Sequence, residues 1–445
     1  MNQSQGLTEG IIWKQLLLFF FPILIGTFFQ QLYNTIDTII VGQYLGTHAL
    51  AAVGSTSNLT NLIINFFVGL SSGATVVIAQ FYGGRDEKRV SLAVHTAMAL
   101  SIVCGILMCV FGVFFSKQCL MMIGVPSDIL NSSALYMQVY FLGMLPGVIY
   151  NIGSGILRAI GDSKTPLYYL VICSVVNIIF DILFVMVLHM GVAGAAIATV
   201  IAQLICAVFV VMKLTKTNDS YQLVLKKIAF DKDILLRIVK IGIPAGIQST
   251  MYSISNIVLQ TRINSFGTNT IAAWAVYVKI DALYWMISAA FGQSITTFIG
   301  QNYGAGLYQR VKLGMKTCLG MSFVAAFIMS GVLAIWGNIF SQIFSNDIQI
   351  IEQTNDIIHY LTPFYFTFVC VEILSGTMRG CGDSLRPMLL VCSGVCVLRI
   401  LWVSFVSPFF TSFHMVIISY PITWIVTSIL FIFYYQVFKK SYLKE

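Results

Sequence analysis

Long apolar stretches alternate with short polar ones along the whole chain, and this alternation predicts its secondary structure. Twelve stretches hold about 20 residues each with almost no charge, which is the length that a helix needs to cross a bilayer. They are expected at residues 14–34, 57–80, 92–115, 133–157, 166–188, 192–213, 237–260, 274–299, 313–337, 357–378, 387–408 and 414–438. These stretches are too long for barrel strands, so the pattern predicts an all-α integral membrane protein.

The composition supports the same class of protein. Of the 445 residues, 58% are hydrophobic and only 9% are charged, whereas a soluble domain has roughly 25% charged residues. The formal net charge of +8 could suggest a nucleic-acid partner, but the basic residues are distributed by side of the membrane. No nucleic-acid partner is therefore expected.

The Lys and Arg residues predict the orientation. All but four of the 25 lie at the chain ends or at connections that share their side; the exceptions are Lys117 and Arg262 on the opposite side and Lys279 and Arg399 within spans. Because cytoplasmic connections carry the excess of Lys and Arg, both termini are expected in the cytoplasm. Two ends on one side also agree with an even number of spans.

A polar stretch from Thr215 to Lys227 divides the spans six and six. We therefore expect an N-terminal six-helix bundle at 1–214, a cytoplasmic linker at 215–235 and a C-terminal six-helix bundle at 236–445.

The two halves repeat one another. QFYGG begins at Gln80 and QNYGA at Gln301, and RAIGDSKTP begins at Arg158 and RGCGDSLRP at Arg379, so both pairs differ by 221 positions. Pro22 and Pro244 differ by 222, so one residue was gained or lost between them and the motifs. Since each half has an even number of helices, both insert the same way up. This predicts a parallel repeat about an axis along the membrane normal, an arrangement typical of secondary transporters.

The repeated turns have a structural explanation. Asp162 and Asp383, or the Ser after each, can cap the following helix, and Pro166 and Pro387 suit its first turn. We expect these turns to serve the fold.

Acidic residues inside spans are different. Of the 17 Asp and Glu residues, only Asp37, Asp181, Asp281 and Glu372 lie well within apolar stretches. Each costs about 2.5–3.5 kcal/mol at a helix centre, and such residues usually mark an ion or substrate pathway. The alternative is an acid paired with a buried base.

The two halves differ in how well that alternative fits. Asp281 could pair across helices, and Glu372 shares its helix with Arg379, so both readings stay open for these two acids. Asp37 and Asp181 have no basic residue in their own spans, so a functional role is favoured for them.

Other polar residues accompany the acids of the first half. Asn177 precedes Asp181 by one helical turn and Tyr33 precedes Asp37 by one turn, so each shares a face with its acid. Asn151 and Thr199 also lie within spans. If all six converge, they form an oxygen-rich pocket that could hold a proton or Na⁺ at Asp37 and Asp181.

The sequence contains no recognisable enzyme motif. There is no Gly-Lys dipeptide, hence no Walker A loop for ATP, and the five His include no HExxH. The ten Cys show no CxxC pair or ligand spacing and are read as packing residues. We expect no enzymatic activity, no cofactor and no metal other than Na⁺.

With these features together, the chain resembles the multidrug and toxic compound extrusion (MATE) family over nearly all its length. The resemblance rests on two six-helix bundles, the Gln-x-Tyr-Gly loop and the RxxGDxxxxP turn in each half. The spacing of Pro22, Tyr33 and Asp37 is closest to the prokaryotic DinF-type branch. That resemblance implies that Asp37 and Asp181 are coupling carboxylates, that Pro22 helps the first helix bend, and that the supporting ligands are Asn151, Asn177, Thr199 and Tyr33.

The chain departs from the NorM-type branch of the same family. Tyr252 stands where that branch has a Glu in span seven, and Phe368 stands where it has an acid eleven residues before Arg379. A C-half Na⁺ site of that kind is therefore not expected, and Asp281 and Glu372 remain possible C-half acids of unassigned role.

The resemblance implies a function. We expect a monomeric antiporter in the cell membrane that exports organic, mostly cationic, drugs and is coupled to H⁺ or Na⁺, with membrane lipids as its other partners. The alternative is a lipid-linked oligosaccharide flippase of the same superfamily, which calls for a basic cavity to meet pyrophosphate. A non-transporting scaffold or receptor would leave the intramembrane acids unexplained.

Overall fold

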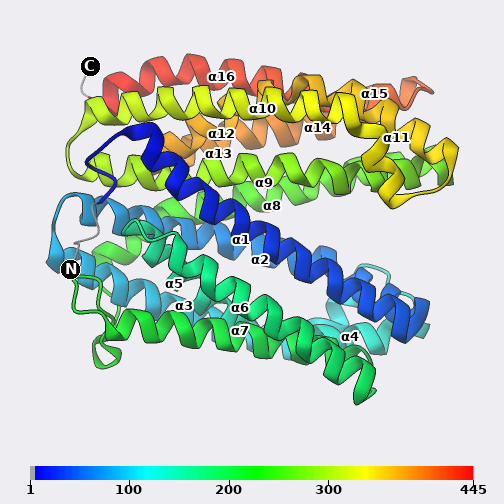
Figure 1. Ribbon diagram of the computed structural model, residues 1–445, viewed down its shortest axis with the longest axis horizontal. Coiled ribbons are helices and arrows are strands. Elements are labelled where there is room, and N and C mark those ends of the chain that lie inside the picture. Colours follow the sequence, from blue (N-terminus) through cyan, green and yellow to red (C-terminus); the bar gives the residue numbers. More distant parts are fainter. Residues whose placement is uncertain (1–5, 444–445) are drawn as a thin grey trace. The chain divides into compact units, whose positions relative to one another are not determined.

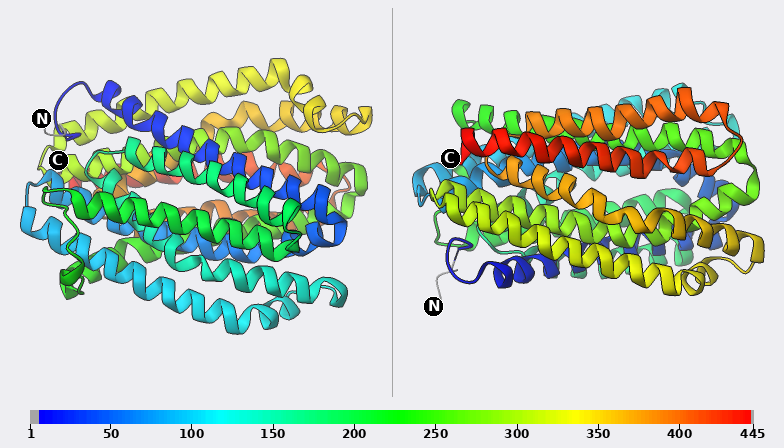
Figure 2. Two further views of the ribbon diagram at one scale, coloured as in Figure 1. Left: turned by 60° about the horizontal axis from the view of Figure 1, so that its bottom comes forward. Right: turned by 90° about the horizontal axis from the view of Figure 1, so that it is seen from above.

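The computed structural model describes residues 6–443, apart from the side chains of Thr47 and Asn58. Both chain ends, including Lys444, lie outside the described residues. Within them the chain is helical and has no strand. In Figures 1 and 2 the long helices of each half run side by side in alternating directions.

From residue 6 onward, the first half contains seven α-helices and three short helical segments of other types. The α-helices are α1 (Ile12–Ile40), α2 (Gly46–Gly83), α3 (Glu87–Met122), α4 (Ser127–Leu142), α5 (Met144–Ala159), α6 (Lys164–Asp181) and α7 (Gly191–Lys216), and the others are the π-helices η1 (Val41–Leu45) and η2 (Ile182–Val187) and the 3₁₀ turn η3 (Leu225–Lys227).

The second half has the same order with more interruptions. Its α-helices are α8 (Lys232–Ile263), α9 (Thr268–Gly304), α10 (Tyr308–Phe344), α11 (Ile348–Leu361), α12 (Tyr365–Gly380), α13 (Leu385–Val391), α14 (Leu398–Leu401), α15 (His414–Ile417) and α16 (Ser419–Tyr442). The 3₁₀ turns η4 (Asn264–Phe266), η5 (Thr362–Phe364) and η8 (Ser407–Phe409) and the π-helices η6 (Cys392–Val397) and η7 (Trp402–Val406) lie between them.

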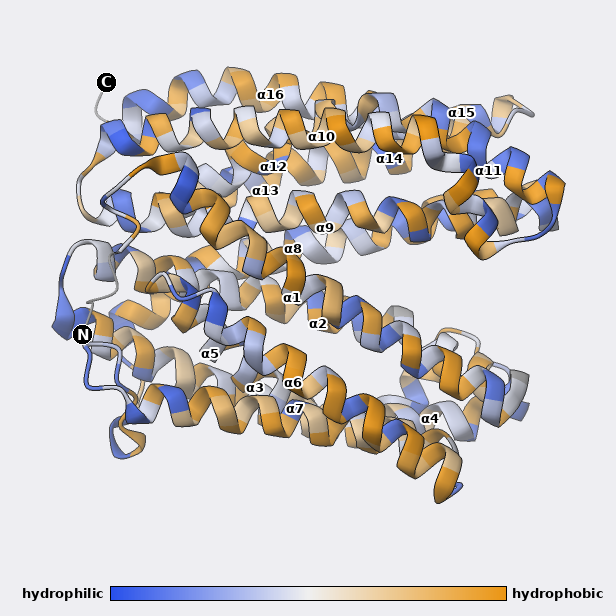
Figure 3. Ribbon diagram, viewed as in Figure 1, coloured by the Kyte–Doolittle hydropathy of each residue, from blue (hydrophilic) through white to orange (hydrophobic). Residues whose placement is uncertain are grey.

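The expected spans are confirmed. Among the described residues, eleven helical segments are long and apolar enough to cross a membrane, and α4 with α5 makes a twelfth that is bent by 44°. Hydrophobic residues cover the middle of these helices, and hydrophilic ones gather at their ends and in the loops (Figure 3). The bend falls at Gly143, next to Pro146 in the first turn of α5, where a proline has no backbone N–H to continue the helix.

The chain forms two compact units. Among the described residues, unit 1 holds 21–243, and unit 2 holds 7–20 and 244–443. These boundaries differ from the expected division at the polar stretch, because α1 and α8 are each shared between the units. α1 divides after Phe20, two residues before Pro22, and α8 divides at Pro244. Each interior proline removes a backbone hydrogen bond from its helix; that Pro22 bends α1 during function stays a prediction.

The expected linker is bound to unit 1. Val224 N donates to His95 Nε2 over 3.0 Å, and Asp231 N donates to Thr96 Oγ1 over 3.1 Å. His95 Nδ1 faces the Ser91 carbonyl at 2.7 Å, so its ring is held from both sides. The connection therefore follows a defined path to α8.

The second copy of the Gln-x-Tyr-Gly loop binds the N-terminal segment within unit 2. Leu7 N donates to Gln301 Oε1 over 2.7 Å, and the Leu7 carbonyl accepts from Asn302 Nδ2. Arg310 donates to the Gly10 carbonyl over 3.0 Å and also reaches the Leu7 carbonyl. This loop satisfies the backbone groups that precede α1.

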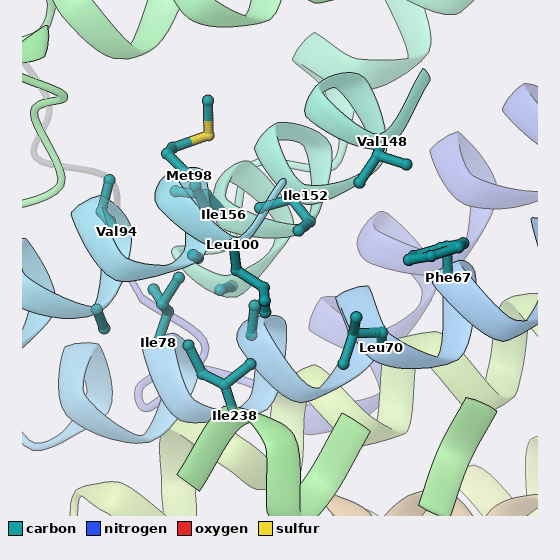
Figure 4. Close-up of a cluster of buried hydrophobic side chains, with 14 of the residues drawn as sticks. Phe67, Leu70, Ile78, Val94, Met98, Leu100, Val148, Ile152, Ile156 and Ile238 are labelled. Carbon is teal, nitrogen blue, oxygen red and sulfur yellow. The ribbon is translucent and has the colours of Figure 1, made fainter. Parts of the chain in front are cut away.

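The core of unit 1 lies among α2, α3 and α5 (Figure 4). Its side chains include Phe67, Leu70, Ile78, Val94, Met98, Ile152 and Ile156, and Ile238 of α8 completes it. Glycine lets these helices approach closely: a Cβ on Gly112 of α3 would collide with the Phe141 ring. The same helix pairings recur in unit 2, where α10 packs on α9 and α12.

The capping expectation for the turns is confirmed by geometry. Asp162 Oδ1 accepts from Thr165 N over 2.9 Å and from Lys164 N over 3.2 Å. Asp383 accepts from Arg386 N and from the Tyr434 hydroxyl. These carboxylates hold the starts of α6 and α13.

Candidate functional site

Asp37 and Asp181 occupy matching places on two helices of unit 1. On each helix the acid has one cavity-lining residue four positions before it and one buried valine four positions after it. These positions are Tyr33, Asp37 and Val41 on α1 and η1, and Asn177, Asp181 and Val185 on α6 and η2. The acids therefore lie at one level, between a polar cavity and an apolar cluster.

The polar atoms at this level lack partners. Asp181 is fully buried, and neither of its carboxylate oxygens accepts a hydrogen bond from any described residue. Asp37 Oδ1, Asn177 Oδ1 and the donor Asn177 Nδ2 also have no hydrogen-bond partner among the described residues. Buried polar atoms in folded proteins are nearly always hydrogen-bonded, so such a group of orphans needs an explanation. A bound proton or cation would supply one.

The two acids also act on each other electrostatically. Neither forms an ion pair with a basic residue in the described part of the chain. In a low-dielectric protein interior, two interacting ionised carboxylates repel each other strongly unless a proton or cation binds between them. The pair is thus suited to exchange a cation.

A cavity of about 110 Å³ lies on one side of the acids. This volume holds several water molecules, since one water needs about 10–15 Å³ by the same measure. Four of the expected site residues line the cavity together: Tyr33, Asn151, Asn177 and Thr199. Asp37 and Asp181 do not line it; each lies four residues after a lining residue of its own helix, so the convergence of all six residues stays a prediction.

Sequence reasoning missed Gln203, which also lines the cavity. Its Oε1 is buried and accepts no hydrogen bond from a described residue. This oxygen lies close to two glycines of the α4–α5 bend: a Cβ would be 2.6 Å from it on Gly143 and 3.2 Å from it on Gly147. The available signal was its position four residues after Thr199, on the same helical face.

Two tyrosines of α4 were missed as well. Tyr136 is buried and stacks on Tyr140 with ring centroids 6.1 Å apart, and both interact electrostatically with Asp37. Their spacing of four residues places them on one face, which the sequence could have shown.

An apolar cluster closes the other side of the acids. It consists of Ile40, Val41, Val53, Tyr136, Val185, Val192, Ala195 and Ala196. Such a cluster excludes water, which strengthens electrostatic effects at the carboxylates next to it.

Both acids also lie beside a change of helix type. α6 ends at Asp181 and continues as the π-helix η2, and α1 continues as the π-helix η1 from Val41, four residues after Asp37. Isolated π-helical turns occur frequently at functional sites. No propensity in the sequence predicts them.

The acids of unit 2 have basic residues within electrostatic range. Asp281 interacts with Arg399, and Glu372 interacts with Arg379. Glu372 lies against Gly292 of α9, where a Cβ would collide with its carboxylate. Lys279 is directed elsewhere and lies 5.7 Å from the Phe344 ring centroid. The alternative of an acid accompanied by a buried base therefore fits these two residues better than it fits Asp37 and Asp181.

Comparison with known proteins identifies the family. A family model described as MatE matches residues 22–183 and, again, residues 244–405. The chain belongs to the MatE family. Since the matches start and end 222 positions apart, they also confirm the internal repeat.

Relatives of this MATE-family transporter cover almost its whole length. It is 29% identical over 454 residues to the "Probable multidrug resistance protein YoeA" of Bacillus subtilis, covering 98% of this chain and 96% of that one. It is 27% identical to the "Probable multidrug resistance protein YpnP" of the same organism, covering 89% of each. The relatives support a multi-pass protein of the cell membrane.

A solved structure shares the fold. A crystal structure described as "MATE in the bent conformation" superposes with a TM-score of 0.92 at 23% identity, covering 100% of this chain and 99% of the other. The expected twelve-helix, two-bundle MATE fold is thereby confirmed. The DinF-type assignment and the roles of the site residues stay predictions.

Proposed function

We propose that this MATE-family chain is an antiporter that exports organic, mostly cationic, drugs while H⁺ or Na⁺ enters the cell by alternating access. Drug export agrees with the names of its relatives, each of which is called a probable multidrug resistance protein. The proposal assigns the chain no enzymatic step, no ATP and no cofactor. It places both termini in the cytoplasm and treats the monomer as the working unit.

One observation carries the ion-coupling part of the proposal: two interacting buried carboxylates whose oxygens lack partners, beside a polar cavity. The carboxylates of Asp37 and Asp181 supply negative charge. The hydroxyl and amide oxygens of Tyr33, Asn151, Asn177 and Thr199 are ligands that Na⁺ accepts, and a proton needs only the carboxylates.

Exchange of a cation here can move the first helix. Binding of H⁺ or Na⁺ removes negative charge from Asp37, which relieves its repulsion with Asp181. Because Pro22 interrupts the backbone hydrogen bonds of α1, the helix can change its bend at low cost. A changed bend would expel the drug, so that cation and drug are not held together.

The driving force is sufficient. Each positive charge that enters yields about 2.3 kcal/mol per 100 mV of membrane potential. Each unit of pH difference adds about 1.4 kcal/mol for a proton. One or two cations per cycle can therefore concentrate a drug outside the cell many-fold.

The flippase alternative has weaker support. A pyrophosphate headgroup needs basic residues, but no Lys or Arg is among the described residues that line the cavity of unit 1. The polar lining consists of Tyr, Asn, Gln, Ser and Thr side chains, which suit neutral or cationic groups better than a double phosphate.

Everted membrane vesicles test the proposal. Export from the cell becomes ethidium uptake into the vesicle, and a pH gradient (acid inside) and a Na⁺ gradient (high inside) are imposed separately. We expect one of the two to drive ethidium accumulation. If neither gradient drives uptake although the protein is inserted and folded, cation-coupled drug export is excluded.

A further inference from the structure

The connection between the last two spans is held near both of its ends. It runs from Ser407 to Phe413, between the π-helix η7 and the short helix α15. The Ser407 carbonyl accepts from Arg262 Nη2 of α8 over 3.4 Å. Just beyond the other end, the Met415 carbonyl accepts from Trp402 Nε1 of η7 over 2.8 Å. These two hydrogen bonds fix where the connection starts and where it stops.

The connection is longer than its counterpart in the first half. Seven residues, 407–413, separate η7 from α15, whereas three residues, 188–190, separate η2 from α7. A longer connection loses more conformational entropy when it becomes ordered, so its order depends more on the contacts that hold it. A further contact within unit 2 is therefore of interest.

His414, the first residue of α15, makes that contact with α11. Its Nε2 lies 2.8 Å from Asp356 Oδ2, and its ring meets the Tyr360 ring at 69° with centroids 4.9 Å apart. Asp356 and Tyr360 are four residues apart, so they share one face of α11. The side chains of His414 and Asp356 are 39% and 59% exposed, so protons in the solvent reach them.

The contact between His414 and Asp356 depends on the charge of the imidazole. A charged imidazole donates to the carboxylate as an ion pair, and 2.8 Å is the length of such a charge-assisted hydrogen bond. A neutral imidazole offers one N–H and no charge. Histidine is the side chain that ordinarily changes charge between pH 5 and 8. The contact is therefore strong in acid and weakens as the pH rises.

Asp356 is the acid that lies against His414. The other titratable or charged residues at this end of unit 2 are Asp347, Glu352, His359 and Tyr360 on or next to α11, Arg262 on α8 and Tyr420 on α16. Asp347 caps α11 by accepting from Gln349 N, and His359 Nδ1 faces the Asn355 carbonyl at 2.8 Å. Glu352 is exposed.

We propose that His414 and Asp356 form a proton-dependent clasp that fastens the connection 407–413 to α11. The hydrogen bonds at Ser407 and Met415 persist at every pH, whereas the clasp closes when His414 is charged. Acid thus reduces the freedom of this end of unit 2. Because the proposed function places both termini in the cytoplasm, this end faces outside and the clasp responds to the external pH; this sidedness alone rests on the proposed function.

Hydrogen exchange of the full-length protein in detergent tests the clasp. The reporters are the amides of Met415 and Val416, which donate to the Ser412 and Phe413 carbonyls and exchange when this turn opens. His414→Gln keeps a neutral donor and is compared with the wild type at equal pH, which cancels the pH dependence of the exchange chemistry. At about pH 5.5 the variant should exchange about two- to fivefold faster, as expected for the loss of a partly exposed ion pair. At about pH 8.5 the two rates should agree within about 1.5-fold.

Asp356 provides the second arm of the experiment. Asp356→Asn should accelerate exchange in the same pH-dependent way, and the double variant with His414→Gln should be no faster than either single variant. His359→Gln, on the same helix, is the matched control and should exchange like the wild type at both pH values.

Three results would overturn the inference: no acceleration in His414→Gln at acid pH, the same acceleration at both pH values, or effects that multiply in the double variant. These readouts require neither transport nor a known orientation in the membrane. The clasp and the proposed antiport function can therefore fail independently of each other.

Discussion

Trp285 Nε1 donates to the Asp281 carboxylate over 2.6 Å, whereas no described side chain donates to either oxygen of Asp181. Both acids are buried in long apolar helices, so the membrane imposes a similar cost on each. They differ in what surrounds them. The hydrogen-bond donors around Asp281 favour a structural role for its carboxylate. The carboxylate of Asp181 has no donor among the described residues and is therefore available to bind a proton or Na⁺.

Replacing Asn177 by an apolar residue should stabilise the protein and weaken its binding of the coupling cation. Asn177→Leu removes two buried polar atoms that lack partners, so the melting temperature in detergent should rise. The affinity for the coupling cation should fall by about 10–100-fold, as for the loss of a supporting ligand. This affinity is measured from the rate of ethidium uptake as a function of the H⁺ or Na⁺ concentration.

A matched control is available on the same helix. Tyr168 is an exposed residue of α6 that does not line the cavity, so Tyr168→Phe should leave the cation dependence unchanged. An unaltered cation dependence in Asn177→Leu would remove Asn177 from the site.

Close helix packing should make Gly112 sensitive to substitution. A Cβ there would collide with the Phe141 ring, so Gly112→Ala should destabilise unit 1 by about 1–3 kcal/mol. Gly331 of α10 has open space around its Cβ position, and Gly331→Ala should be neutral or stabilising by about 0.5–1 kcal/mol. Melting temperatures of the two variants check this, and equal losses would contradict it.

Much of the fold could be predicted from the sequence. Span length and hydropathy are properties of consecutive residues, so all twelve spans followed from them. The repeat was visible because its motifs sit at the turns, where capping and glycine conformations restrict the choice of residue.

The division into compact units was not predictable in the same way. The polar stretch marks a connection, but His95 and Thr96 bind that connection to unit 1 through backbone groups, which leave no trace in residue type. The interior prolines Pro22 and Pro244 were the better markers, because each lies at or within two residues of the division of its helix.

The candidate site was predictable where its residues are spaced by helical turns. Asn177 and Asp181 share a face, and so do Tyr33 and Asp37. Gln203 was missed although it follows the same rule after Thr199. The bond from Tyr365 to Asp281 could not be predicted, because Tyr365 is 84 positions away and reaches the carboxylate only through the packing of unit 2.

The hydrogen bond between His95 and the connection that leads to α8 predicts a local effect of substituting His95. His95→Phe removes the acceptor for Val224 N, so hydrogen exchange at the Val224 amide should accelerate by about tenfold or more, which is the loss of one buried hydrogen bond of about 1.4 kcal/mol. The amide of Thr165, capped by Asp162, should keep its exchange rate. Exchange at Val224 that does not change would show that the hydrogen bond does not hold the segment.

Ethidium uptake by everted vesicles containing Asp37→Asn tests the central claim most directly. Asn keeps the shape of the side chain but cannot carry the negative charge that attracts the coupling cation. Gradient-driven uptake should be lost while the protein remains inserted and folded, and Glu352→Gln, at an exposed acid of α11, should transport like the wild type. Undiminished uptake by Asp37→Asn would contradict the account.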